Sequence, residues 1–235
     1  DTYHALIETI FNDYQIPVFI DEKKSMLHHS LIEFIRSALD TVEGNWRYDA
    51  VFRVLKTGFI PQTDETYPLT PDAIDELENY VLEYGIRSRE TWVSEEEWKF
   101  QRFRGFDRQV QTDEEKKVQT RINAYRDQVN TILQPFDEQI RSAKTVLERC
   151  TAIYNLLEAV GAPVRLEKMR RDYDEAGEIE KGREQEQVWN AVIQLLDEMV
   201  EMAGEEKMSL SVFRSVLDAG LETLKFSHVP PTLDH

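Results

Sequence analysis

The hydrophobic residues of this 235-residue chain recur mainly at spacings of three and four, which places them on one face of an α-helix. A first stripe runs from Tyr3 to Tyr14. The longest runs from Val118 to Leu157, roughly ten helical turns, and two more cover residues 188–202 and 210–224. The pattern predicts a mainly α protein, built as a multi-helix arm.

Helix-end signals divide these stripes. Residues 70–72 combine a capping hydroxyl, a proline and an acid, and Gly85 closes the helix that they begin. Residues 94–97 and 112–115 both match the capping box, in which a hydroxyl and a glutamate bind free amides at a helix start. Pro135 lies inside the longest stripe. Because proline removes a helix hydrogen bond, we expect a kink or a break there, with Pro135 beginning a second helix.

One short β-rich run, residues 15–20, breaks the helical pattern and predicts a single buried strand. A lone strand leaves backbone donors and acceptors unpaired on both edges. We therefore expect the rest of its sheet to lie outside this sequence, and interpret the chain, which begins with Asp1, as a piece of a longer protein. An uncovered face at Ile16, Val18 and Ile20 predicts that the isolated piece self-associates.

Charge and cysteine content exclude several classes of protein. The chain has 45 acidic and 28 basic residues, a net charge of −17, so nucleic-acid binding requires a local basic patch. A single cysteine, Cys150, excludes an internal disulfide and a four-cysteine metal or iron–sulfur site. The sequence has neither a signal peptide nor an apolar run of about 20 residues, so we expect a cytoplasmic protein with no membrane contact.

No residue pattern indicates catalysis. The sequence has no glycine-rich phosphate loop and no nucleophile elbow. The metal-like spacing of His28, His29 and Glu33 supplies too few ligands from one helix, and we favour a helix start with a half-buried histidine. Cys150 lies on an apolar stripe, as a core residue does. We predict no catalytic residue, no metal site and no cofactor in this chain.

The best candidate contact site is the segment 98–108, where aromatic and cationic residues alternate. Such a segment can stack nucleic-acid bases while its cations hold phosphates. The candidate contacts to nucleic acid or a partner are Trp98, Lys99, Arg102, Arg104 and Arg108. The favoured alternative is a helix edge whose aromatics pack into a core with the cations turned outward.

A second basic group follows Pro163 and consists of Arg165, Lys168, Arg170 and Arg171. Acidic residues follow closely at Asp172, Asp174 and Glu175. We interpret the group as a solvated helix face paired with these acids.

The order of these elements resembles a known family. Residues 3–8, 16–19, 28–36 and 49–55 resemble the region around motif IV of UvrD-like superfamily-one helicases. A closer resemblance is to the AddB family, the second subunits of bacterial AddAB helicase-nucleases. It rests on the amino-acid sequences of residues 21–26, 45–48, 98–105 and 217–222. The resemblance covers the chain in blocks and is weakest in the middle.

The resemblance implies three regions. Residues 1–60 would be the edge of a RecA-like motor domain, 61–226 a helical insertion of the 2B type, and 227–235 a return toward the motor. The parent would be an ATP-dependent helicase and exonuclease in DNA double-strand-break repair and recombination, with ATP, magnesium and an iron–sulfur cluster bound elsewhere.

The implied role of this chain is non-catalytic: it would brace the motor and contact duplex DNA or an AddA-type partner subunit. The alternative is a free-standing helical scaffold that binds a protein through amphipathic helices. The single strand favours the first hypothesis, because a scaffold has no reason to keep an isolated strand.

Overall fold

The computed structural model describes residues 24–102 and 110–227. These residues form nine helices and no sheet, which confirms the prediction of a mainly α fold. The expected first helix, the strand at residues 15–20 and the segment 228–235 lie outside the described residues.

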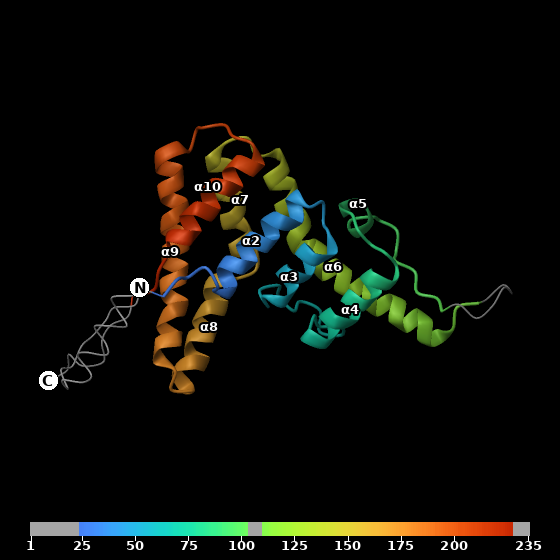
Figure 1. Cartoon of the computed structure of the whole chain (residues 1–235). Coiled ribbons are helices and arrows are strands. Elements are labelled where there is room, and N and C mark those ends of the chain that lie inside the picture. The colour runs from blue at the N-terminus through green and yellow to red at the C-terminus, as the bar shows by residue number, and fades with distance from the viewer. Residues whose placement is uncertain (1–23, 103–109, 228–235) are drawn as a thin grey trace, which may run out of the picture.

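The helices follow one another with short connections. Their bounds are α2 Ser30–Glu43, α3 Tyr48–Lys56, α4 Pro71–Glu83, α5 Arg89–Trp92, α6 Asp113–Ser142, α7 Val146–Ala159, α8 Ala162–Glu175, α9 Ile179–Ala203 and α10 Leu210–Thr223. Figure 1 shows α8 and α9 side by side as a hairpin, while α6 extends from the α7 end of the molecule to the end where α4 and α5 lie. Helix α2 packs on α3, α6, α9 and α10, so one apolar core runs through the described residues.

The first and last described segments of backbone pair with each other. Ser25 and Lys225 form an antiparallel bridge. The amide of Met26 donates to the carbonyl of Leu224 at 3.0 Å, and the amide of Phe226 donates to the carbonyl of Lys24 at 2.8 Å. All nine described helices lie between these two segments.

The helix starts show which local signals determine structure. Thr70 caps α4 by accepting from the amide of Ala73, as predicted. The capping box of Thr112 and Glu115 at the start of α6 is confirmed. A further capping box, Thr145 with Glu148, begins α7.

The prediction of a kink or a new helix at Pro135 was wrong in its stronger form, because α6 continues through this residue as one helix of 30 residues. Pro135 is exposed, whereas Ile132, Leu133 and Phe136 beside it are buried. Packing of these side chains holds the helix together where proline weakens its hydrogen bonds. The chain leaves the helix only at Ala143, which has extended backbone.

The predicted helix start at residues 94–97 was also wrong, because no helix begins there and Glu95 and Glu96 form a bend. The Ser94 hydroxyl accepts from the amide of Glu96, two residues on, as in a local turn. The guanidinium of Arg126 in α6 donates to the carbonyls of Ser94 and Glu96, which an α-helix would need for its own hydrogen bonds.

Candidate nucleic-acid or partner contact site

A row of aromatic rings leads from the core to the surface beside the segment that the sequence singled out. The ring of Trp98 meets Trp92 edge-on at 5.0 Å and stacks on Tyr80 at 5.4 Å. Tyr80 in turn stacks on Tyr84 at 4.3 Å. Trp92 is fully buried, whereas Tyr84 is 39% exposed, so the row presents one supported ring to solvent.

Side chains of α6 hold the segment 98–102 in place. The Asn123 side chain accepts from the amide of Trp98 and donates to its carbonyl, both at 2.9 Å. Gln119 accepts from the amide of Phe100 at 3.1 Å. These amide side chains satisfy backbone groups that a neighbouring strand would otherwise pair.

The row is also joined to this segment by Tyr80, whose hydroxyl donates to the carbonyl of Lys99 at 2.7 Å. Burial raises the pKa of Tyr80 well above its usual value, so the phenol stays protonated and remains a donor. The guanidinium of Arg126 lies over the Trp98 ring, 5.1 Å from its centroid. Burial lowers the pKa of this guanidinium without removing its charge.

The structure divides the five predicted contact residues. Trp98 is only 6% exposed and its indole donates to the carbonyl of Thr91, so it is a core residue, as the packing alternative proposed. Lys99 and Arg102 are exposed, and neither side chain has a carboxylate partner in the described ranges. The described part of the segment has no regular secondary structure, so it is not a helix edge. Arg104 and Arg108 lie outside the described residues.

Together, Tyr84, Lys99 and Arg102 provide an exposed ring beside two cations. A ring supported from below can stack a nucleic-acid base or a planar side chain. Three exposed acids at residues 95–97 precede the two cations and repel phosphate. The site therefore suits one stacked group with one nearby anion better than a long phosphate track.

The sequence interpretation missed Tyr80 and Tyr84. Tyr80 lies in the helix that was correctly predicted to begin at residues 70–72 and Tyr84 is its C-cap, and their spacing of four places them on one face. That spacing was the available signal, but the segment 98–102 that completes the row comes from elsewhere in the chain.

The two isolated candidates for chemistry have structural roles. His29 is the N-cap of α2: its Nδ1 accepts from the amide of Leu31 at 3.1 Å, and its Nε2 lies 3.0 Å from the Gln185 side-chain oxygen. Cys150 is buried at 3% exposure, and burial raises the pKa of its thiol to about 12. Within residues 24–102 and 110–227, no three His, Cys, Asp or Glu side chains are grouped to hold a metal.

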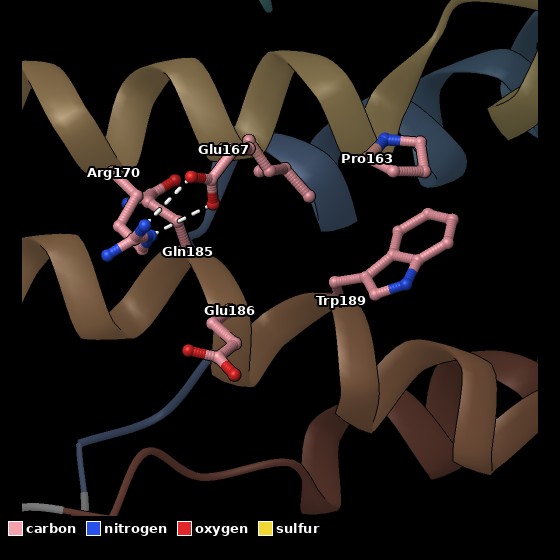
Figure 2. A pocket seen from close by; sticks show the side chains of 7 residues that line it. Pro163, Glu167, Arg170, Gln185, Glu186 and Trp189 are labelled. Atoms are coloured by element: carbon pink, nitrogen blue, oxygen red, sulfur yellow. Dashed lines mark hydrogen bonds and ion pairs between the residues drawn. The ribbon is translucent and has the colours of Figure 1, made fainter.

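The basic group on α8 is largely a solvated, paired face. Arg170 binds Glu167 at 2.8 Å and Asp174 at 3.1 Å, and Arg171 lies 3.7 Å from Glu167. The predicted pairing with Asp174 is confirmed, and Glu167 takes the place expected for Asp172 and Glu175. Figure 2 shows the Arg170–Glu167 pair at one end of a small pocket between α8 and α9, with Pro163 and Trp189 at the other.

Comparison with known proteins gives a consistent result. No family model matches the chain. The chain is 63% identical over 235 residues to the AddB subunit of the ATP-dependent helicase/deoxyribonuclease of Oceanobacillus iheyensis. It is 44% identical over 236 aligned residues to the subunits of the same name from Bacillus mycoides and Bacillus cereus strain B4264. Each alignment covers 100% of this chain and 20% of the relative, so the chain spans about a fifth of the proteins that it matches. No helix of the described residues is long and apolar enough to cross a membrane.

Proposed function

Since the chain is homologous along its whole length to part of the AddB subunit of ATP-dependent helicase/deoxyribonucleases, we propose that it is a non-catalytic helical region of such a protein. The relatives' names describe ATP-dependent action on DNA. The sequence itself has no phosphate loop that could bind ATP in the usual way. In this proposal the whole protein processes DNA double-strand breaks in the cytoplasm. This region braces the motor domain and contacts DNA or the partner subunit.

The same proposal assigns the cofactors to other parts of the protein. ATP and magnesium would be bound by the motor, and an iron–sulfur cluster requires several cysteine thiolates. Cys150, the single cysteine of the chain, is buried among apolar side chains and does not fit that role. We place residues 1–60 at the edge of the motor, 61–226 in the helical arm, and 227–235 in the return.

The observation that supports a contact role is the aromatic row ending at Tyr84, with Lys99 and Arg102 beside it. Its ring is preorganised, because Tyr80 and Trp98 fill the space beneath it, so little side-chain entropy is lost on binding. The contacted group would be a base exposed at the end of the duplex DNA substrate, and a planar side chain of the AddA-type partner subunit is the alternative that the experiment separates.

The test uses the intact two-subunit enzyme with Tyr84, Lys99 and Arg102 replaced by alanine. Duplex affinity should fall, and the slope of log affinity against log salt should decrease by roughly 0.9 for each lost phosphate contact. The matched control replaces Lys168 and Arg171, two exposed cations of α8, and should bind DNA as the wild type does.

Two outcomes locate the contact elsewhere. If the variant binds DNA normally but its subunits dissociate at higher concentration, the surface meets the partner subunit. If DNA binding, salt dependence and subunit assembly all match those of the control, the contact role of this site is wrong. A variant that hydrolyses ATP normally would agree with the proposed non-catalytic role.

A further inference from the structure

A cavity of about 300 Å³ lies away from the aromatic row, where the end of α3, the loop after it, the start of α4 and helix α8 meet. Its wall is largely aliphatic. The apolar lining residues are Leu55, Ile60, Leu69, Pro71 and Ile74. Three charged side chains, Lys56, Asp75 and Arg165, also line it.

Arg165 differs from Lys56, the other cation of the cavity, because no carboxylate of the described residues pairs with it. The guanidinium lies over the Phe59 ring, 5.9 Å from the centroid, and its Nη2 is 3.6 Å from the position that a Cβ on Gly58 would occupy. Its side chain makes no hydrogen bond or ion pair with any described residue. Burial lowers the pKa of Arg165 with no carboxylate opposing the effect. A half-buried guanidinium has donors to satisfy, and here they border an open cavity.

The neighbouring charges set the charge of a ligand. Lys56 is already paired with Glu78 at 2.6 Å, so it offers little to an additional anion. Asp75 lines the same cavity and repels negative charge. The balance favours a ligand with a single negative charge and disfavours a phosphate dianion.

We propose that this cavity binds a monocarboxylate carried on an aliphatic stem, with the carboxylate on the Arg165 guanidinium and the stem against the aliphatic wall. A carboxylate matches the guanidinium fork, which can donate two parallel hydrogen bonds to it. An aliphatic stem gains from leaving water along Ile60, Leu69 and Ile74. The carboxylate can belong to a free aliphatic acid or to a glutamate side chain flanked by apolar residues.

The test uses saturation-transfer NMR, which detects weak ligands of large proteins, to measure binding to the full-length protein. The probes are hexanoate, hexanol, inorganic phosphate and the blocked peptide acetyl-Leu-Glu-Leu-amide. Hexanoate or the peptide should bind, and which one binds better identifies the source of the carboxylate. Arg165→Gln should weaken binding about tenfold or more, whereas Arg171→Gln, on the exposed face of the same helix, should leave it unchanged.

A second variant keeps the proposal testable if Arg165→Gln does not fold. Asp75 is exposed, so Asp75→Asn should preserve the fold and tighten hexanoate binding by removing a repelling charge. The proposal is overturned if hexanol binds as well as hexanoate, if phosphate displaces hexanoate at equal concentration, or if neither carboxylate probe binds. The proposal is also overturned if hexanoate binds and its affinity is changed by neither Arg165→Gln nor Asp75→Asn.

Discussion

The indole N–H of Trp46 donates a hydrogen bond of 3.0 Å to the carboxylate of Asp137, and both side chains are fully buried. Trp46 lies in the turn between α2 and α3, whereas Asp137 lies in the second half of α6. Trp46 and the preceding Asn45 have positive φ angles of 61° and 52°, a conformation that L-residues adopt at a cost. The hydrogen bond holds this strained turn against α6.

Asp137 accepts from three donors, so its removal should be strongly destabilising. Arg89 and Arg141 also bind it, at 2.6 and 3.0 Å. Asp137→Ala leaves the buried indole without an acceptor, and we expect a loss of about 3 kcal/mol in the free energy of unfolding. Urea denaturation followed by tryptophan fluorescence measures it. Glu138→Ala, which removes the exposed neighbour, is the control, and an equal effect of the two changes would contradict the structural role of Asp137.

His29 should make stability depend on pH below its ordinary pKa of 6.5. Burial lowers the pKa of His29 in the folded protein, and a hydrogen bond to Gln185 only partly opposes this. As pH falls through 6.5, the unfolded chain binds a proton that the folded chain refuses, so the free energy of unfolding decreases until the folded pKa is passed. Above 6.5 both states are neutral and this dependence vanishes.

His29→Asn tests the assignment, because asparagine keeps an N-cap acceptor but does not titrate. We expect the variant to lose this part of the acid dependence, measured as urea midpoints from pH 7.5 to 5. His28→Gln, at the exposed neighbouring histidine, should keep it. An unchanged pH profile in His29→Asn would assign the effect to another group.

Cys150 should be inert to alkylation in the folded protein. Its thiol is buried and has a pKa raised to about 12, so very little reactive thiolate exists at pH 8. Iodoacetamide labelling followed by mass spectrometry should be slow and should accelerate with urea as the chain unfolds. Val164→Cys places a second thiol at a position that is 74% exposed and supplies the internal control. Equal labelling rates at both positions without urea would refute this prediction.

Pro135→Ala should stabilise α6. The residue is exposed within a continuous helix, and proline is about 3 kcal/mol less favourable than alanine in a helix interior. Proline also restricts the unfolded chain, which offsets up to about 1 kcal/mol, so we expect a net gain of about 2–3 kcal/mol. Thermal unfolding measures the gain against Gln134→Ala, an adjacent substitution without the backbone effect. A lower melting temperature for Pro135→Ala would show that the ring makes contacts worth more than the missing hydrogen bond.

Sequence patterns predicted structure wherever the determining contacts are local. The capping signals at residues 70–72 and 112–115 act within one helical turn, and both were correct. The same kind of signal at residues 94–97 failed, because Arg126 in α6 takes the carbonyls that a helix would use. Pro135 misled for a related reason, since burial of its neighbours outweighs a local helix breaker.

The candidate site could be predicted only in part. The sequence directed attention to Trp98, Lys99 and Arg102, and its favoured packing alternative foresaw a buried Trp98, but it did not reveal that this ring stacks on Tyr80. The exposed ring of Tyr84 comes from the C-cap of α4, and the cavity at Arg165 joins it to residues as distant in sequence as Leu55. Such sites depend on long-range packing, which one sequence does not specify by spacing alone.

The bridge between Ser25 and Lys225 gives the helical region a narrow neck. The backbone segment before the first described helix and the segment after the last one run side by side here. Every described helix lies between them in the sequence and contributes to one continuous core. Because these helices share one core, we expect a displacement of the paired backbone segments to move the helices together. Joining the chain directly across this bridge would therefore remove all nine described helices together, including α2 and α3 of the proposed motor edge.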